Sequence, residues 1–127
     1  MIDMTGIRTF NVIIADDDRD ICDALSGLIG DDPRFDVRGV AHSGTDAAML
    51  ARTQPVDLAV VDVQMPQGGI EAIEAIHAIS PSIQVAVFTA KTGSRLHTQL
   101  LGVGAAAVFH KGDSLDLREA LAALLTD

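Results

Sequence analysis

The sequence contains no tryptophan and no tyrosine, and aromatic residues make up only 3% of its 127 residues. It therefore offers no aromatic platform on which bases or sugars could stack. Basic residues are also scarce, since nine Lys and Arg stand against 18 Asp and Glu and give a formal net charge of -9. Because nucleic-acid binding relies on clustered basic side chains, we expect no direct contact with nucleic acid.

Disulfides, metal-ligand spacing and long apolar runs are missing as well. The single cysteine, Cys22, cannot form an internal disulfide. The four histidines have no metal-ligand spacing with one another or with Cys22, so a zinc site is not expected. The longest apolar run, at residues 103–109, is far shorter than the roughly 20 residues that span a bilayer. With no basic and apolar leader at the start of the chain, these features predict a cytoplasmic protein without membrane contact.

Apolar residues, by contrast, are abundant and recur in a regular order. They make up 48% of a chain whose length suits one domain. Short apolar runs alternate with segments of helical period, which is typical of βα units and a parallel sheet. We expect strands at residues 10–15, 35–41, 58–61, 83–88 and 105–109, each followed by a helix. Residues 1–9 are then an N-terminal tail, and residues 10–127 form a single α/β domain.

The expected helices have recognisable ends and apolar stripes. Asp18 and Ser43 are placed to cap the first two helices, and Asp46, three residues after Ser43, resembles the second half of a capping box. Pro81 follows the third helix and stops it. The side chains expected to face the core are Ile21, Cys22, Leu25, Leu28 and Ile29 in the first helix, Ala47, Leu50 and Ala51 in the second, Ile70, Ile73, Ile76 and Ile79 in the third, Leu96, Leu100 and Val103 in the fourth, and Leu117, Leu121 and Leu124 in the fifth.

Reactive polar residues follow four of the five expected strands. They are Asp16 and Asp17 after the first strand, Asp62 after the third, Thr89 after the fourth and Lys111 after the fifth. In an open sheet of parallel strands, ligands bind in the crevice beyond the carboxyl ends of the strands. We therefore expect these side chains to meet at one edge of the sheet.

Carboxylates, a hydroxyl and an ammonium group together suit the handling of a phosphoryl group. A carboxylate such as Asp62 can attack phosphorus to form an acyl phosphate. The charges of nucleophile and phosphoryl group repel each other, so a hard cation is needed, and Mg²⁺ takes carboxylate oxygens such as those of Asp16 and Asp17. Lys111 and Thr89 offer a positive charge and a hydroxyl to phosphoryl oxygens.

In these residues and their order, the chain resembles the receiver domain of bacterial two-component response regulators over residues 11–125. The resemblance implies a single doubly wound, flavodoxin-like domain with a five-stranded parallel sheet in the order 2-1-3-4-5. It implies Asp62 as the phosphoacceptor, Asp16 and Asp17 as the acidic pair, Thr89 as the switch hydroxyl and Lys111 as the family's lysine. It also implies Mg²⁺ held directly by Asp17, Asp62 and the backbone carbonyl of Gln64, with Asp16 acting through water.

The function implied by this resemblance is a signalling switch rather than an enzyme with an external product. The phosphoryl group would come from a histidine kinase or a histidine phosphotransfer protein. The phosphorylated form would change conformation and control an output domain or a partner, as in transcription regulation. A homodimer through the fourth helix, the fifth strand and the fifth helix is a further expectation.

The chain departs from the family pattern at three places. The segment Met-Pro-Gln-Gly-Gly at residues 65–69 is one residue shorter than the family's usual loop. Gly112 stands after Lys111 where proline is usual, and Val108 stands where the family usually has an aromatic switch residue. We therefore expect a switch that works without an aromatic rotamer.

Two other functions fit parts of the pattern. Asp16-Asp17-Asp18 after a strand is similar to the Asp-x-Asp opening of haloacid-dehalogenase-like phosphatases, although that function leaves Asp62 without a role. A receiver fold kept only for docking, without phosphorylation, is the second alternative. It would be marked by loss of an acidic or lysine position, and none is lost here.

Overall fold

The computed structural model describes residues 9–65, 68–91, 93–113 and 116–125. Most of the expected N-terminal tail therefore lies outside the described residues, as do Pro66 and Gln67 of the shortened loop. Within the described parts, no helix is both long and apolar enough to cross a membrane.

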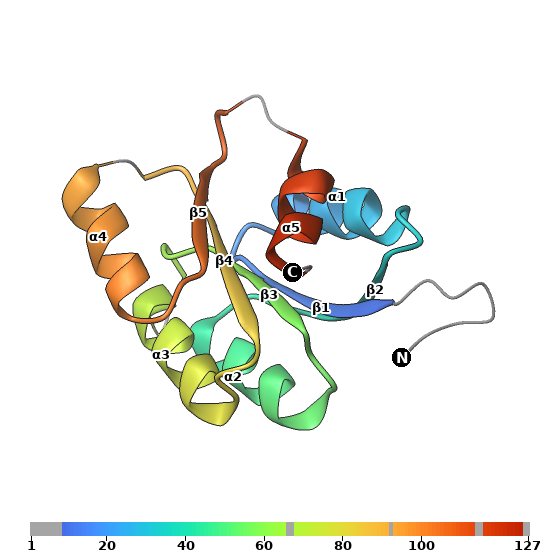
Figure 1. Ribbon diagram of the computed structural model, residues 1–127, viewed down its shortest axis with the longest axis horizontal. Coiled ribbons are helices and arrows are strands. Elements are labelled where there is room, and N and C mark those ends of the chain that lie inside the picture. Colours follow the sequence, from blue (N-terminus) through green and yellow to red (C-terminus); the bar gives the residue numbers. More distant parts are fainter. Residues whose placement is uncertain (1–8, 66–67, 92, 114–115, 126–127) are drawn as a thin grey trace.

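Five parallel strands form one sheet in the order β2-β1-β3-β4-β5 (Figure 1). The strands are β1 Phe10–Ala15, β2 Phe35–Ala41, β3 Leu58–Val61, β4 Gln84–Thr89 and β5 Ala107–His110. The expected fold and strand order are confirmed, and the first three strands have the expected bounds. β4 begins and ends one residue later than expected, so Thr89 belongs to it. β5 begins two residues later and ends one residue later than expected, so it is shorter and includes His110.

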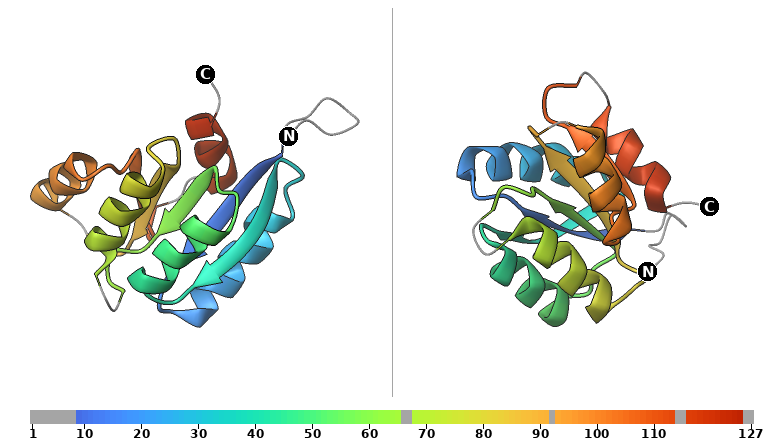
Figure 2. Two further views of the ribbon diagram at one scale, coloured as in Figure 1. Left: turned by 90° about the horizontal axis from the view of Figure 1, so that it is seen from below. Right: turned by 90° about the vertical axis from the view of Figure 1, so that its left-hand side faces the viewer.

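The helices cover both faces of the sheet (Figures 1 and 2). They are α1 Arg19–Gly30, α2 Gly44–Thr53, α3 Gly69–Ile79, α4 Ser94–Gly102 and α5 Leu117–Leu125. α1 and α5 lie on one face, and α2, α3 and α4 lie on the other. This doubly wound arrangement follows from parallel strands, whose connections must cross over a face of the sheet.

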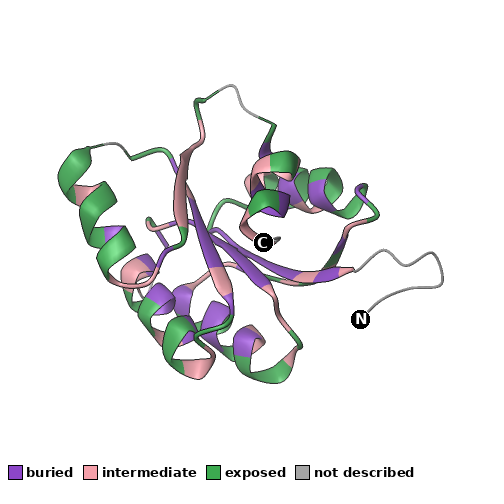
Figure 3. Ribbon diagram, viewed as in Figure 1, coloured by how far each residue is buried: buried purple, intermediate pink, exposed green. Residues whose placement is uncertain are grey.

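Each face of the sheet has its own hydrophobic core. Alternate residues of β1 divide between them, with Ile13 packed toward α2, α3 and α4, and Val12 and Ile14 packed toward α1 and α5. In Figure 3 the inner strands β1, β3 and β4 are largely buried and lie between helices whose outer faces are exposed. Burial on both faces explains why the inner strands β1, β3 and β4 contain continuous apolar runs in the sequence.

The pairing of β1 with β2 contains an irregularity that matters for the site. The register shifts between Val12 and Ile13, and beyond it Ala15 lies opposite Ala41. The chain segments that leave the two strands, Asp16 and His42, therefore lie side by side.

The expected helix caps are confirmed, and one core assignment is wrong. Asp18 accepts hydrogen bonds from the amides of Asp20 and Ile21, and Ser43 accepts one from the amide of Asp46. Leu28, expected to face the core, is 41% exposed. It precedes the buried Ile29 by one position, which is about 100° around a helix, so it lies at the rim of the buried stripe.

Candidate functional site

Three carboxylates meet at the carboxyl ends of β1 and β3. Ala15 pairs with Val61, so Asp16 and Asp62 leave adjacent strands at the same level. One carboxylate oxygen each of Asp16, Asp17 and Asp62 lies within 4.8 Å of the others. Asp16 and Asp62 are buried, whereas Asp17 is exposed. The strand-end argument thus placed these three side chains together correctly.

Lys111 brings a positive charge to the two buried carboxylates. Its Nζ lies 2.7 Å from Asp16 Oδ2 and 3.3 Å from Asp62 Oδ2. Its backbone amide donates to the carbonyl of Thr89 at 2.9 Å, so the pairing of β5 with β4 carries the lysine to this edge. Burial opposes the charge of Lys111, but the hydrogen bond to Asp16 and the charges of Asp62 and Asp16 outweigh it and raise its pKa.

Asp62 is held in an environment that disfavours its charge. Burial raises its pKa, and the nearby charge of Asp16 adds to this effect. The amide of Gln64, which donates to Asp62 Oδ1 at 3.2 Å, and the Lys111 charge act in the opposite direction without cancelling the rise. The contact with Lys111 therefore does not offset the effect of burial on Asp62.

The donor set fits a hard divalent cation. Its oxygens come from carboxylates, two of them are buried, and their mutual repulsion would fall if a cation lay between them. The described residues bring no thiol and no imidazole into this group of ligands, which is consistent with Mg²⁺ rather than Zn²⁺.

Thr89 lies at the same edge of the sheet, but it is not bonded to the acidic cluster formed by Asp16, Asp17 and Asp62. The side chain is fully buried, and its Oγ1 accepts a hydrogen bond from the amide of Lys91 at 3.1 Å. Among the described residues nothing accepts the hydroxyl proton, which leaves it able to donate to a ligand.

The shortened loop after Asp62 depends on a glycine at the start of α3. A Cβ added at Gly69 would lie 2.3 Å from Val63 Cα and 2.7 Å from the carbonyl oxygen of Asp62. Gly68, which precedes the helix, has a φ of 69°, a conformation that glycine adopts without strain. The two glycines thus let the helix begin directly against the backbone of the candidate acceptor.

His42 is a contact of the site that sequence reasoning missed. Its Nδ1 lies 3.0 Å from the carbonyl oxygen of Asp16, beside the thiol of Cys22 at 3.7 Å. Cys22 itself is buried in α1, as expected, and burial together with the charge of Asp16 raises its pKa. His42 follows β2, so the strand-end rule that selected the other residues could have found it.

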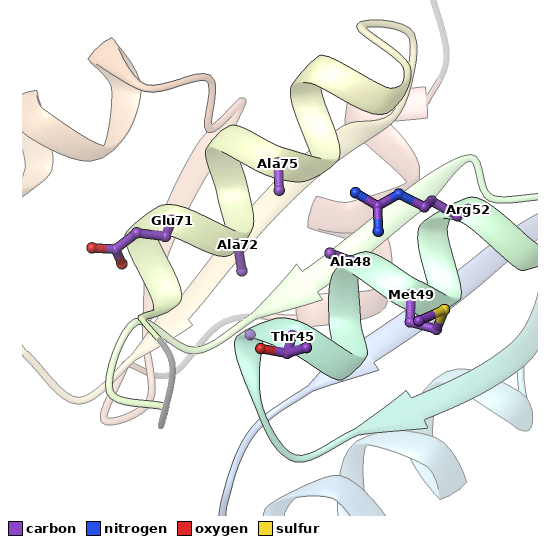
Figure 4. A pocket seen from close by; sticks show the side chains of 8 residues that line it. Thr45, Ala48, Met49, Arg52, Glu71, Ala72 and Ala75 are labelled. Carbon is purple, nitrogen blue, oxygen red and sulfur yellow. The ribbon is translucent and has the colours of Figure 1, made fainter.

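The open groove between α2 and α3 lies apart from these residues (Figure 4). It has a volume of about 280 Å³ and a floor of small apolar side chains that includes Ala48, Ala72 and Ala75. None of the acidic cluster lines it, so the groove is not the candidate site.

Comparison with known proteins places this chain in a family. The family model described as response regulator receiver domain matches residues 12–122. The response regulator UvrY of Escherichia coli strain K12 is 30% identical over 103 residues, covering 80% of this chain and 47% of the relative. The chain thus spans about half the length of that curated relative.

Other relatives point to the same domain. A protein-glutamate methylesterase/protein-glutamine glutaminase of a Nocardioides species is 33% identical over 105 residues, covering 80% of this chain but only 28% of the relative. A two-component response regulator of the LuxR family from an Aurantimonas species has a solved structure with a TM-score of 0.87 and 27% identity. That match covers 92% of this chain and 85% of the other. By its family match, its fold and its relatives, this chain belongs to the response regulator receiver domains of two-component systems.

Proposed function

We propose that Asp62 is the phosphoacceptor of this receiver domain and that the domain extends over residues 10–127. The observation that carries the proposal is the Lys111 ammonium group, which contacts both Asp16 and Asp62 while Asp17 lies within reach of the same carboxylates. Asp62 leaves the central strand of the sheet, with Asp16 and Asp17 after β1 on one side and Lys111 after β5 on the other. An incoming phosphoryl group would meet all of these side chains at once.

The transfer needs few steps. A carboxylate oxygen of Asp62 attacks phosphorus, the bond from phosphorus to the donor breaks, and the donor leaves with the bonding electron pair. The pKa of Asp62 is raised in the metal-free protein, where Asp62 is buried and lies close to the charge of Asp16. Lys111 would exchange part of its contact with Asp16 for a phosphoryl oxygen, and the free proton of Thr89 would donate to another.

Mg²⁺ bound by Asp17, Asp62 and the backbone carbonyl of Gln64, with Asp16 acting through water, would offset the repulsion between the carboxylates and the phosphoryl group. The three carboxylates support this assignment, because their oxygens converge without a soft ligand among them. The exposed position of Asp17 supports it further, since a ligand there remains open to water and to the incoming donor.

Phosphorylation would act on the rest of the molecule through Thr89, the last residue of β4, and Lys111, which directly follows β5. Val108 lies half-buried on β5 and packs against the core beneath α4, and as a stiff β-branched residue it provides no aromatic rotamer. We infer that the moving parts are the segment that follows Thr89 and the start of α4. The face formed by α4, β5 and α5 would then differ between the two states and serve dimerisation or docking.

The donor would be a histidine kinase or a histidine phosphotransfer protein in the cytoplasm, and the output would be regulatory. The relatives UvrY and the LuxR-family protein are named as response regulators, which favours control of transcription through a segment or partner outside this domain. The net charge of -9 disfavours direct contact of this domain with nucleic acid. The methylesterase relative leaves room for an enzymatic output elsewhere, but this domain itself would act as a switch.

Acetyl phosphate with Mg²⁺ tests the proposal. The wild-type chain should gain the mass of one phosphoryl group on Asp62, and Asp62→Asn should gain none. Asp57→Asn serves as a control, since Asp57 precedes β3 and lies at the opposite end of that strand. A label on another residue would refute the assignment, and no label on the wild-type chain would favour the docking-only alternative. The phosphatase alternative is disfavoured by the family match and by the place of Asp62 in the cluster.

A further inference from the structure

Asp17 differs from the other two carboxylates in how it is held. Asp16 is bonded through Oδ1 to the amide of Asp18 at 2.9 Å and through Oδ2 to Lys111, and Asp62 is bonded to Lys111 and Gln64. Among the described residues, no group bonds to the Asp17 carboxylate. The backbone that carries it therefore sets the position and direction of its Cα–Cβ bond, from which the carboxylate reaches Asp62.

That backbone is fixed at the peptide group between Asp16 and Asp17. The carbonyl oxygen of Asp16 lies 3.0 Å from His42 Nδ1 and 3.2 Å from Cys22 Sγ. A carbonyl oxygen only accepts hydrogen bonds, so Nδ1 carries the proton and donates. Because the peptide group is planar, holding its oxygen also orients the bond that leads to the Asp17 Cα.

The end of β2 holds Asp16 on both sides. The amide of Asp16 donates to the carbonyl of Ala41 at 3.1 Å, and the next residue, His42, donates to the carbonyl of Asp16. The register shift in β2 creates this alignment by setting Ala41 opposite Ala15. Cys22 completes the contact from α1, but it is 1% exposed and also fills the core, whereas His42 is only half-buried. His42 is thus the member of this group whose polar contact can be removed with little loss of packing.

We propose that His42 is a positioning residue for the cation site. Its Nδ1–H group holds the peptide between Asp16 and Asp17 so that the Asp17 carboxylate faces Asp62. The inference deepens the proposed function, on which its consequence for Mg²⁺ rests, by adding a residue that follows β2 to a site otherwise built at the carboxyl ends of β1, β3, β4 and β5.

Two substitutions separate the hydrogen bond from the bulk of the ring. His42→Leu removes the donor and keeps an apolar side chain, while His42→Asn places an amide N–H close to the position of Nδ1. We expect His42→Leu to weaken Mg²⁺ binding about three- to tenfold, the range for loss of one hydrogen bond, and His42→Asn to stay within about twofold of wild type. Titration of the backbone amide NMR signals with Mg²⁺ measures both constants. His42→Ala serves in place of His42→Leu if the leucine variant does not fold.

Ser43→Ala is the matched control for a general loss of stability. It removes the cap of α2 beside His42, and it should lower the melting temperature without changing the Mg²⁺ constant. Equal Mg²⁺ affinity in wild type and His42→Leu would overturn the proposal, and so would an asparagine variant as weak as the leucine variant. Weakening in Ser43→Ala equal to that in His42→Leu would overturn it as well.

Amide hydrogen exchange at Asp17 and Asp18 in the metal-free protein gives a readout that does not depend on phosphorylation or on Mg²⁺. Exchange should be faster in His42→Leu and return to the wild-type rate in His42→Asn, and unchanged exchange in both would contradict the positioning role. If the wild-type chain takes no label on Asp62, the proposed function fails while the Mg²⁺ constants still decide the role of His42. If the wild type binds no Mg²⁺ at all, the exchange rates decide it.

Discussion

Two groups of acidic residues, each with one basic partner, lie at opposite ends of the sheet and respond to their surroundings in opposite ways. At the amino end of β2, Arg34 donates to Asp32 through Nε at 3.0 Å and Nη2 at 2.7 Å, and Nη2 also reaches Glu119 of α5 at 2.7 Å. At the carboxyl ends of the strands, Lys111 reaches Asp16 and Asp62.

The pKa values of the buried carboxylates show the difference. Hydrogen bonds from Arg34 lower the pKa of Asp32, and the bonds to Asp32 and Glu119 raise the pKa of Arg34. Burial raises the pKa of Asp62 despite the presence of Lys111. The folded protein thus favours the ionised form of Asp32, whereas it disfavours the ionised form of Asp62.

The contrast separates a structural from a functional use of the same residue types. The guanidinium group of Arg34 offers several fixed donors, so both Asp32 and Glu119 receive a hydrogen bond from it. These bonds connect the loop before β2 with α5. The ammonium group is a single point charge shared by carboxylates that outnumber it. The unmet negative charge is what a cation and a phosphoryl transfer site require.

Removal of Lys111 should have the largest effect on stability. Lys111→Met keeps the length of the side chain but leaves Asp16 and Asp62 buried without their cation, which should cost about 2–4 kcal/mol in the metal-free protein. Mg²⁺ should restore much of the loss, because it supplies positive charge to the same carboxylates. Urea denaturation followed by circular dichroism measures both effects. Lys91→Met, at an exposed lysine whose backbone alone contacts Thr89, is the control, and equal losses in the two variants would contradict the argument.

Mg²⁺ itself should stabilise the acidic end of the sheet, where Asp16, Asp17 and Asp62 follow the strands, and should leave the amino end, with Arg34 and its partners, unaffected. At a concentration one hundred times its dissociation constant it should raise the free energy of unfolding by about 2.7 kcal/mol. Asp17→Asn should keep wild-type stability without Mg²⁺, because its carboxylate is exposed and unbonded among the described residues, but should lose most of the gain. Asp23→Asn, on the exposed side of α1, should keep the whole gain. An equal response in the two variants would remove Asp17 from the cation site.

The acidic end could be predicted from the sequence far better than the amino end. Asp16, Asp62 and Lys111 follow apolar runs, and parallel pairing brings all strand ends of one kind to one edge, so topology alone assembles them. The contact between Arg34 and Glu119 joins residues 85 positions apart through the packing of α5, which no local pattern encodes. Contacts between side chains of different helices and loops depend on such packing, whereas strand-end positions do not.

Loss of Asp32 should have a smaller effect than loss of Lys111 and should not respond to Mg²⁺. Asp32→Ala removes the acceptor for the Arg34 side chain and backbone amide, which should cost about 1–2 kcal/mol. Because the folded-state pKa of Asp32 is lowered, its contribution is present above the ordinary carboxyl value and is lost as pH falls through the folded value. Denaturation of Asp32→Ala and wild type across acidic pH should therefore converge. Glu119→Ala, at a largely exposed partner, should change stability by less than about 1 kcal/mol.

Replacement of Asp62 should produce the smallest effect, with the opposite sign. Because its folded-state pKa is raised, ionised Asp62 opposes folding at neutral pH, and Asp62→Asn should raise the melting temperature of the metal-free protein by a few degrees. As pH falls through the raised folded value, wild-type Asp62 takes up a proton, so the advantage of the variant should shrink. It should vanish below the ordinary carboxyl pKa of 3.8. Calorimetry between neutral and acidic pH, with and without Mg²⁺, measures this dependence. A variant less stable than wild type at neutral pH without Mg²⁺ would show that Lys111 compensates Asp62 as fully as Arg34 compensates Asp32, and the contrast between the two ends of the sheet would then disappear.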